Sequence, residues 1–230
     1  MPDSGFSLRI ATYNLRGLKD DADTAAAVVR AIDPDVLLLQ EVPRHPASAN
    51  SLTAFARETG LLWSGRTRWL SGTSMMTSMR LLPTDSRDAR LKVGLRENPR
   101  SYTYCHVRRP DGPPVTVASI HLSLRSEQRV EHARTILAEL GAAGDPEAPL
   151  VIGGDLNEDS SGAAWGVFGE ELGEVVPHRP TYPATAPVHP IDTIFARGHV
   201  TAVPGDPDLL EGMPLARATD HLPVWVDLTF

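Results

Sequence analysis

The sequence predicts a protein that combines α-helices with β-sheet in one domain over residues 1–230. Short apolar runs of strand length recur along the chain, and amphipathic stretches with capping residues lie between several of them. Several of these runs also end in polar side chains that could form a site. A length of 230 residues with 41% hydrophobic content allows a sizeable core, and no linker divides the chain.

The first strands and helix follow one another closely. Residues 8–13 alternate polar and apolar side chains, as a half-buried strand does, and the run ends at Asn14. Residues 20–32 are predicted to form a helix, which begins with three aspartates and ends before a proline. Residues 36–39 are apolar throughout, which is typical of a strand covered on both faces.

The middle of the chain predicts a second helix and a hairpin. Ser51 can cap a short helix that closes at Gly60, and strands are expected at residues 61–64 and 74–79. Further strands at residues 102–108 and 115–122 flank a Pro-Asp-Gly-Pro turn signal. The second strand of this hairpin carries His121 near its end.

The last part predicts one more helix and three strands. Ser126 opens a helix that closes at Gly141, with apolar positions at 130, 133, 137 and 140. Strands follow at residues 149–152, 191–195 and 222–228, separated by a proline-rich loop at residues 177–190.

Charge is distributed unevenly. The chain carries a net charge of −7, but residues 61–110 hold ten arginines or lysines and three acidic residues, a local charge of +7. Such a chain could bind an anion with its basic region and a metal with its acidic part, although a solvated basic hairpin explains the pattern equally well. Within this region we assign substrate binding to Arg80 and Arg108.

The compartment is predicted from what the sequence lacks. A single cysteine, Cys105, cannot form an internal disulfide, which is compatible with the cytoplasm. No secretory signal and no apolar run of membrane-spanning length is visible. We therefore expect a cytoplasmic monomer without a membrane partner.

One stretch has the character of a site. An apolar run enters Gly153-Gly154, and Asp155 and Asn157 follow at a spacing of two. On an extended chain these two side chains would project to the same side, and the glycines would let a bulky ligand approach the backbone. The alternative is an ordinary turn after a buried strand.

Similar polar residues occur at the other strand ends. The set comprises four carboxylates, two amides and two histidines: Asn14, Glu41, His121, Asp155, Asn157, Asp192, Asp220 and His221. Oxygen-rich ligand sets favour Mg²⁺, Mn²⁺ or Ca²⁺ over zinc. A hard cation on phosphate oxygens, with a base for water, indicates phosphoester hydrolysis. The sequence contains neither a Gly-x-Ser-x-Gly elbow nor a P-loop.

Six motifs in order resemble those of the endonuclease/exonuclease/phosphatase superfamily, which includes enzymes of the DNase I type. They are Ala11-Thr12-Tyr13-Asn14, the run 34–42 ending in Gln40-Glu41-Val42, Ser119-Ile120-His121-Leu122, Gly153-Gly154-Asp155-Leu156-Asn157, Ile191-Asp192-Thr193-Ile194 and Thr219-Asp220-His221-Leu222-Pro223-Val224. The resemblance implies an α+β fold, a four-layer α/β/β/α sandwich of two packed, mainly antiparallel sheets. The sequence departs from the family pattern at residues 72–80, where many relatives carry Gly-x-Ala-Ile-Leu-Ser-Arg.

The resemblance also implies roles for the first group of residues. Glu41 would be the principal ligand of a Mg²⁺ or Mn²⁺ ion, with Asn14 beside it and Asp220 contributing. Asp155 and Asn157 would position and deprotonate the attacking water.

For the remaining residues the resemblance implies phosphate contacts. Asp192 would hydrogen-bond His221 and favour its cationic form, which stabilises charge on the phosphoryl oxygens. His121 would contact phosphate or protonate the leaving group, and the identity of the general base stays open. Without a ligand, Asn14 would be a turn residue, Asp220 a cap and His121 a core histidine.

Three functions follow from these patterns. The first is a metal-dependent phosphodiesterase or nuclease acting on nucleic acid, favoured by the basic region. The second is a phosphatase or phosphodiesterase of a small phosphorylated metabolite, favoured by the acidic overall charge and short length. The third is a non-catalytic binding domain of the same fold.

Overall fold

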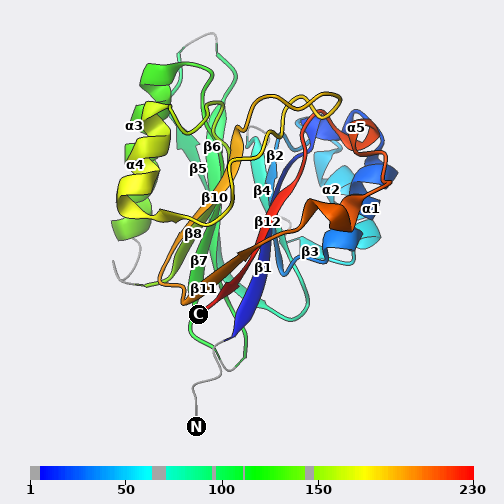
Figure 1. The fold of residues 1–230 in the computed structure, drawn as a ribbon, viewed down its shortest axis with the longest axis horizontal. Helices are drawn as coiled ribbons and strands as arrows, with labels where there is room; N and C mark the ends of the chain where they lie inside the picture. Colours follow the sequence, from blue (N-terminus) through cyan, green and yellow to red (C-terminus); the bar gives the residue numbers. More distant parts are fainter. Residues whose placement is uncertain (1–5, 64–70, 95–96, 111, 143–147) are drawn as a thin grey trace.

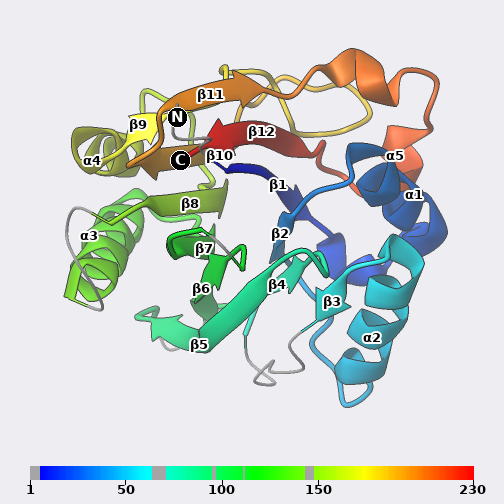
Figure 2. The same ribbon diagram turned by 90° about the horizontal axis from the view of Figure 1, so that it is seen from below.

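Two six-stranded sheets pack face to face, with helices on both outer faces (Figure 1, Figure 2). The computed structural model describes residues 6–63, 71–94, 97–110, 112–142 and 148–230. The first sheet has the order β11 (Thr201–Pro204), β12 (Val224–Thr229), β1 (Ser7–Asn14), β2 (Val36–Gln40), β4 (Thr73–Thr77), β3 (Leu62–Trp63). The second has the order β5 (Leu82–Leu91), β6 (Arg100–Arg108), β7 (Val115–His121), β8 (Leu150–Asp155), β10 (Asp192–Arg197), β9 (Gly173–Glu174).

The helices complete the four layers. Helices α1 (Ala22–Ile32), α2 (Ser48–Thr59) and α5 (Leu215–Ala218) lie beside the first sheet, and α3 (Ser126–Ala142) and α4 (Ala163–Glu171) cover the second (Figure 2). Two short 3₁₀ helices, η1 (Arg16–Leu18) and η2 (Pro207–Leu210), lie in connections. This arrangement confirms the expected four-layer sandwich. Among the described residues, none of the helices combines the length and apolar character that spanning a bilayer requires.

Alternation along the strands divides the core into three layers. In β2, Leu37 and Leu39 pack with the helices of the first sheet, whereas Val36 and Leu38 pack between the two sheets. A third apolar cluster joins the second sheet to α3 and α4. The uninterrupted apolar run in β2 thus reflects burial on both faces, as the sequence predicted.

Helix ends follow their capping residues. Asp21 accepts a hydrogen bond from the backbone N–H of Thr24 at 3.0 Å and caps α1, and Asp33 ends it in the left-handed conformation. Helix α2 begins at Ser48, one turn before the predicted cap. The Ser51 hydroxyl instead donates to the carbonyl of Ala47 within the helix, so the cap prediction was wrong. The predicted stop at Gly60 is confirmed.

The basic region contains a strand that the sequence did not reveal. The predicted hairpin forms between β6 and β7, and β5 joins its outer edge. Because β5 is an edge strand with mostly exposed residues, four of its ten charged, it lacks the apolar alternation that identifies a strand. Helix α3 buries Ala133, Ile136 and Leu140, whereas the predicted positions Val130 and Leu137 are only partly buried.

The two glycines of β8 make room for protein rather than for a ligand. A Cβ atom at Gly153 would lie 2.8 Å from Cδ1 of Leu38 in the opposite sheet. A Cβ atom at Gly154 would lie 2.0 Å from the carbonyl oxygen of Ile120 in the neighbouring strand. The predicted approach of a ligand to this backbone is therefore wrong.

A stability prediction follows from this contact. Replacing Gly154 with alanine should lower the free energy of unfolding by about 1–3 kcal/mol, because the backbone of β7 cannot yield as a side chain can. Urea unfolding measures it. Gly166→Ala is the control: that glycine lies inside α4, and a Cβ atom added there would meet nothing within 4 Å, so the variant should gain about 0.5–1 kcal/mol. Equal stability of both variants would contradict the expected clash.

Each sheet contains one parallel pair of strands, and both pairs end at the same edge of the sandwich. Strands β1 and β2 are parallel, as are β7 and β8, with His121 opposite Asp155 in register. Strand β10 runs antiparallel to β8 and begins at Asp192, opposite Asp155. The polar strand ends predicted from the sequence therefore converge from both sheets.

Candidate active site

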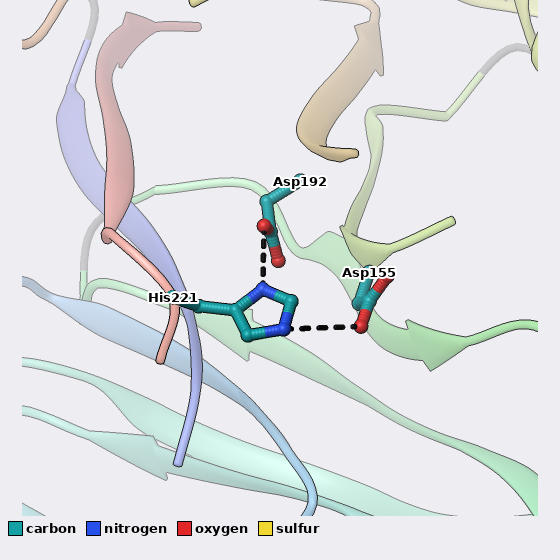
Figure 3. Close-up of side chains that lie close together, drawn as sticks. All are labelled: Asp155, Asp192 and His221. Carbon is teal, nitrogen blue, oxygen red and sulfur yellow. Dashed lines mark hydrogen bonds and ion pairs between the residues drawn. The ribbon is translucent and has the colours of Figure 1, made fainter. Parts of the chain in front are cut away.

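A buried histidine lies between two carboxylates at this edge (Figure 3). The Nδ1 atom of His221 is 2.8 Å from Oδ2 of Asp192, and its Nε2 atom is 3.9 Å from Oδ2 of Asp155. The Thr181 hydroxyl donates to the same Asp192 oxygen at 2.6 Å. Since a carboxylate only accepts, the proton of this pair lies on Nδ1 of His221, which leaves Nε2 facing Asp155.

Asp155 is the centre of the hydrogen-bond arrangement. Its Oδ2 atom accepts from the side-chain amide of Asn14 at 3.0 Å and lies 3.5 Å from Nε2 of His121. Its Oδ1 atom accepts from the backbone N–H of Asn157 at 2.9 Å. Asn14 comes from the first sheet and Asp155 from the second, so this contact joins the sheets directly.

Asn157 follows a turn and not an extended chain. Its φ angle is 53°, in the left-handed region, and its side-chain amide donates to the carbonyl of Leu122 at 3.1 Å. The expected projection of Asp155 and Asn157 from an extended segment was wrong, and the turn alternative describes the backbone. Asn157 nevertheless lines the cavity described below.

Burial and charge shift the pKa values of these groups apart. Burial raises the pKa of Asp155 to about 7, and the nearby Asp192 carboxylate acts in the same direction. Burial alone would lower the pKa of His221, but the carboxylates of Asp192 and Asp155 more than offset this and raise it to about 9. Burial and the cations Arg100 and Arg44 hold the pKa of His121 well below its usual value. His221 is therefore a cation and His121 a neutral imidazole near pH 7.

A cavity of about 660 Å³ opens beside this cluster. Its lining includes Glu41, His121 and Asn157 from the predicted set, together with Arg44 and Arg100. Glu41 has a φ angle of 46°, a left-handed conformation that costs a residue with a side chain some strain. Its carbonyl accepts from the backbone N–H of Gly17, which helps to hold this conformation.

The donor set suits a hard cation. Among the described residues, no hydrogen bond or ion pair engages the Glu41 carboxylate, so both of its oxygens can bind a metal. Asp155, Asp192 and His221 also place ligand atoms within 4.8 Å of one another. However, Asp192 and His221 already bond each other, which favours Glu41 as the main ligand. Oδ1 of Asn14 accepts from the backbone N–H of Arg16 at 3.0 Å, and its second lone pair could add another oxygen ligand.

Asp220 lies beside His221 in sequence, but its carboxylate pairs with an arginine. Its Oδ2 atom is 3.3 Å from Nε of Arg16, and its Oδ1 atom accepts from the Thr219 hydroxyl at 3.4 Å. A metal-binding role for Asp220 would have to displace Arg16, so the geometry does not favour the expected contribution.

Arg80 and Arg108 do not lie at this edge. Arg80 pairs with Asp35 at 2.8 Å and with Asp33 at 3.5 Å, next to the start of β2 and therefore opposite to Glu41. Arg108 is the last residue of β6, whose first residue is at the site. The expectation failed because a net charge along the sequence does not specify which end of a strand each cation occupies.

The cations that do line the cavity are Lys19, Arg44 and Arg100, none of which was predicted from the sequence. A Nη1–Nε2 distance of 3.0 Å brings Arg100 against His121. The predicted hairpin contained the signal: if His121 ends one strand, the residues that begin its antiparallel partner must lie next to it.

Comparisons with known proteins agree with this geometry. The Endonuclease/Exonuclease/phosphatase family profile matches residues 11–221. A search of curated proteins finds no match.

Similar solved structures share the fold. A family protein from Bacteroides thetaiotaomicron aligns with a TM-score of 0.76 and 18% identity, covering 98% of each chain. A mannosyl-6-phosphatase from the same organism gives 0.75 and 18%, covering 97% of this chain and 100% of its own. The human Nocturnin catalytic domain, with bound sulfate, gives 0.72 and 16%, covering 97% and 94%. The chain thus belongs to the endonuclease/exonuclease/phosphatase family and is a phosphoester hydrolase.

Proposed function

We propose that the protein hydrolyses the phosphoester of a small phosphorylated molecule by attack of water at phosphorus, with Mg²⁺ or Mn²⁺ as cofactor. The observation that carries the proposal is the buried Asp192–His221–Asp155 arrangement beside a cavity lined by Glu41. When bound at Glu41 and Asn14, the cation would polarise the phosphoryl oxygens.

The residues of this chain would divide the remaining work. Asp155, with a pKa of about 7, can orient the attacking water and accept its proton, while Asn157 borders the same space. Cationic His221 stabilises charge that develops on the phosphoryl oxygens. Asp192 acts as a positioning residue, since it orients the ring of His221 and stabilises its cationic form. Neutral His121 can hydrogen-bond a phosphoryl oxygen.

The substrate class is inferred from the cavity and from the distribution of cations. A volume of about 660 Å³ lies within the range of small-molecule sites. Among the described basic residues between 61 and 110, Arg100 alone lines it, and Arg80 and Arg109 face Asp35 at the opposite end. The main support for a nucleic-acid groove is therefore weakened.

A phosphodiester of nucleic acid is the second candidate. The exposed side chains of Lys19 and Arg44 border the cavity, where they could contact the phosphates of an extended strand.

One panel tests both candidates. Purified protein is incubated with Mg²⁺ or Mn²⁺ and with nucleotides, sugar and inositol phosphates, p-nitrophenyl phosphate, bis(p-nitrophenyl) phosphate, and single- and double-stranded DNA and RNA. EDTA-sensitive release of product from small esters supports the first candidate. Cleavage of polynucleotides alone supports the second, and the absence of any hydrolysis rejects both.

The metal position has its own test. Glu41→Gln should weaken Mn²⁺ binding by about a hundredfold, because the variant loses the charged oxygen ligand that faces the cavity. Isothermal titration calorimetry measures the affinity. Glu170→Gln, on the exposed face of α4, is the matched control and should bind Mn²⁺ as the unmodified protein does. If Glu41→Gln binds Mn²⁺ with unchanged affinity, the cation site lies instead at Asp155, Asp192 and His221.

A further inference from the structure

Arg44 and Arg100 line the cavity without a carboxylate partner among the described residues. Several other arginines that pack against the protein surface pair with acids, such as Arg9 with Asp227 at 2.7 Å and Arg129 with Glu158 at 2.6 Å. The contact of Arg100 is instead with His121, which is neutral and supplies no charge. Among the described residues, neither guanidinium therefore forms a hydrogen bond or ion pair with a carboxylate, although Glu41 and Asp155 are near enough to act on them electrostatically.

The place of Arg44 is built into the backbone. A Cβ atom at Gly72 would lie 1.9 Å from Nη2 of Arg44, so the guanidinium rests where any other residue would put a side chain. The Gly72 carbonyl accepts from the backbone N–H of Val42 at 3.2 Å, which fixes the loop that carries Arg44. The absence of a side chain at Gly72 thus leaves the space that the Arg44 guanidinium group occupies.

The electrostatic surroundings are those of an anion site. Burial lowers the pKa of Arg100, although the carboxylates of Asp155 and Glu41 oppose this shift. Burial of the part of the Arg44 side chain that packs over Gly72 lowers the pKa of Arg44 in the same direction, although the residue as a whole is exposed. A cation that is removed from water without a counter-ion carries a free-energy cost of desolvation, and an anionic ligand would supply the counter-ion. Two guanidinium forks match the two charges of a phosphate monoester better than the single charge of a carboxylate.

Resting on the phosphoester hydrolysis proposed above, we propose that Arg44 and Arg100 bind a second phosphate of a small substrate, separate from the phosphoryl group that is hydrolysed. The scissile group would lie with Glu41, Asp155 and His221. Arg44 and Arg100 line the same cavity as Glu41, and its volume of about 660 Å³ exceeds the space that one phosphate group fills. The enzyme would thereby select molecules with two phosphate groups over those with one.

The test compares binding of fructose 6-phosphate and fructose 1,6-bisphosphate by calorimetry in EDTA, so that it does not depend on turnover. The bisphosphate should bind about 10- to 100-fold more tightly. Arg44→Gln should reduce this ratio to near one. Gly72→Ala should also reduce it, because the added methyl group displaces the guanidinium while keeping its charge. Arg108→Gln, an exposed arginine at the far end of β6, should leave the ratio unchanged.

Other outcomes would overturn the inference. A ratio near one in the unmodified protein, or a ratio insensitive to Arg44→Gln, removes the second phosphate site. If 6-phosphogluconate also binds more tightly than fructose 6-phosphate, by the same factor as the bisphosphate, the arginines accept any anion and are not specific for a phosphate. Stronger binding of an oligonucleotide than of the bisphosphate, lost in Arg44→Gln, assigns the arginines to nucleic acid. Hydrolysis of p-nitrophenyl phosphate or bis(p-nitrophenyl) phosphate, measured in parallel, shows independently whether the proposed function holds.

Discussion

Replacing Asp155 with asparagine is expected to reduce kcat/KM by about 10²–10⁴-fold. The carboxylate at this position has a pKa of about 7 and can accept a proton from water, which an amide cannot. Both oxygens of Asp155 accept hydrogen bonds, Oδ2 from the Asn14 amide and Oδ1 from the backbone N–H of Asn157. In the asparagine variant, the NH₂ group would replace one of these oxygens and face a donor. The hydrolysis rate of the best substrate in the panel measures the effect.

Stability separates lost chemistry from lost folding in this variant. Burial disfavours the ionised form of Asp155, so the neutral side chain removes a desolvated charge. The melting temperature of Asp155→Asn should therefore stay close to that of the unmodified protein, because removal of this charge offsets the cost of the NH₂ group that faces a donor. An active variant would contradict the proposed role of Asp155, and an inactive variant that melts far lower would assign the loss to folding.

Asp192→Asn should produce a loss of about 10²–10⁴-fold in kcat, by analogy with carboxylates that orient a catalytic histidine and stabilise its cation. The Asp192 carboxylate raises the pKa of His221 to about 9, against the effect of burial. Without it, His221 loses its proton at a lower pH. Because the cationic form is the one proposed to act, the alkaline fall in activity should move to lower pH in the variant.

The pH profile of the residual activity distinguishes positioning from general structural damage. A smaller rate with an unshifted alkaline limb would show that Asp192 does not act through His221. Thr181→Val offers a milder control, since the Thr181 hydroxyl donates to the same Asp192 oxygen at 2.6 Å and carries no charge. Its alkaline limb should move less than that of Asp192→Asn.

Local sequence patterns predicted the strands that carry the site. The apolar runs before Asn14, Glu41, His121 and Asp155 were predicted as strands, and each forms a strand that is buried in the sandwich. Helix α4 was missed because Gly166 and Gly169 weaken its helical pattern.

The remaining errors concern the partners of each segment. The sequence region around Arg80 is basic, but only the pairing of β4 with β2 determines that Arg80 faces Asp35. Arg44 could not be predicted from a motif, because its position depends on the absence of a side chain at Gly72, 28 residues away. Contacts between distant segments set these positions, and the local pattern carries no record of them.

The hydrogen bond between Asn14 and Asp155 has a consequence for how the enzyme loses activity. It bridges the two sheets, and every strand of the second sheet comes from one continuous segment between Leu82 and Arg197. Neither half of the sandwich holds a complete set of reacting groups. Mild denaturant that loosens the seam between them should abolish turnover while circular dichroism still reports intact strands, so inactivation would serve as an early sensor of sheet separation.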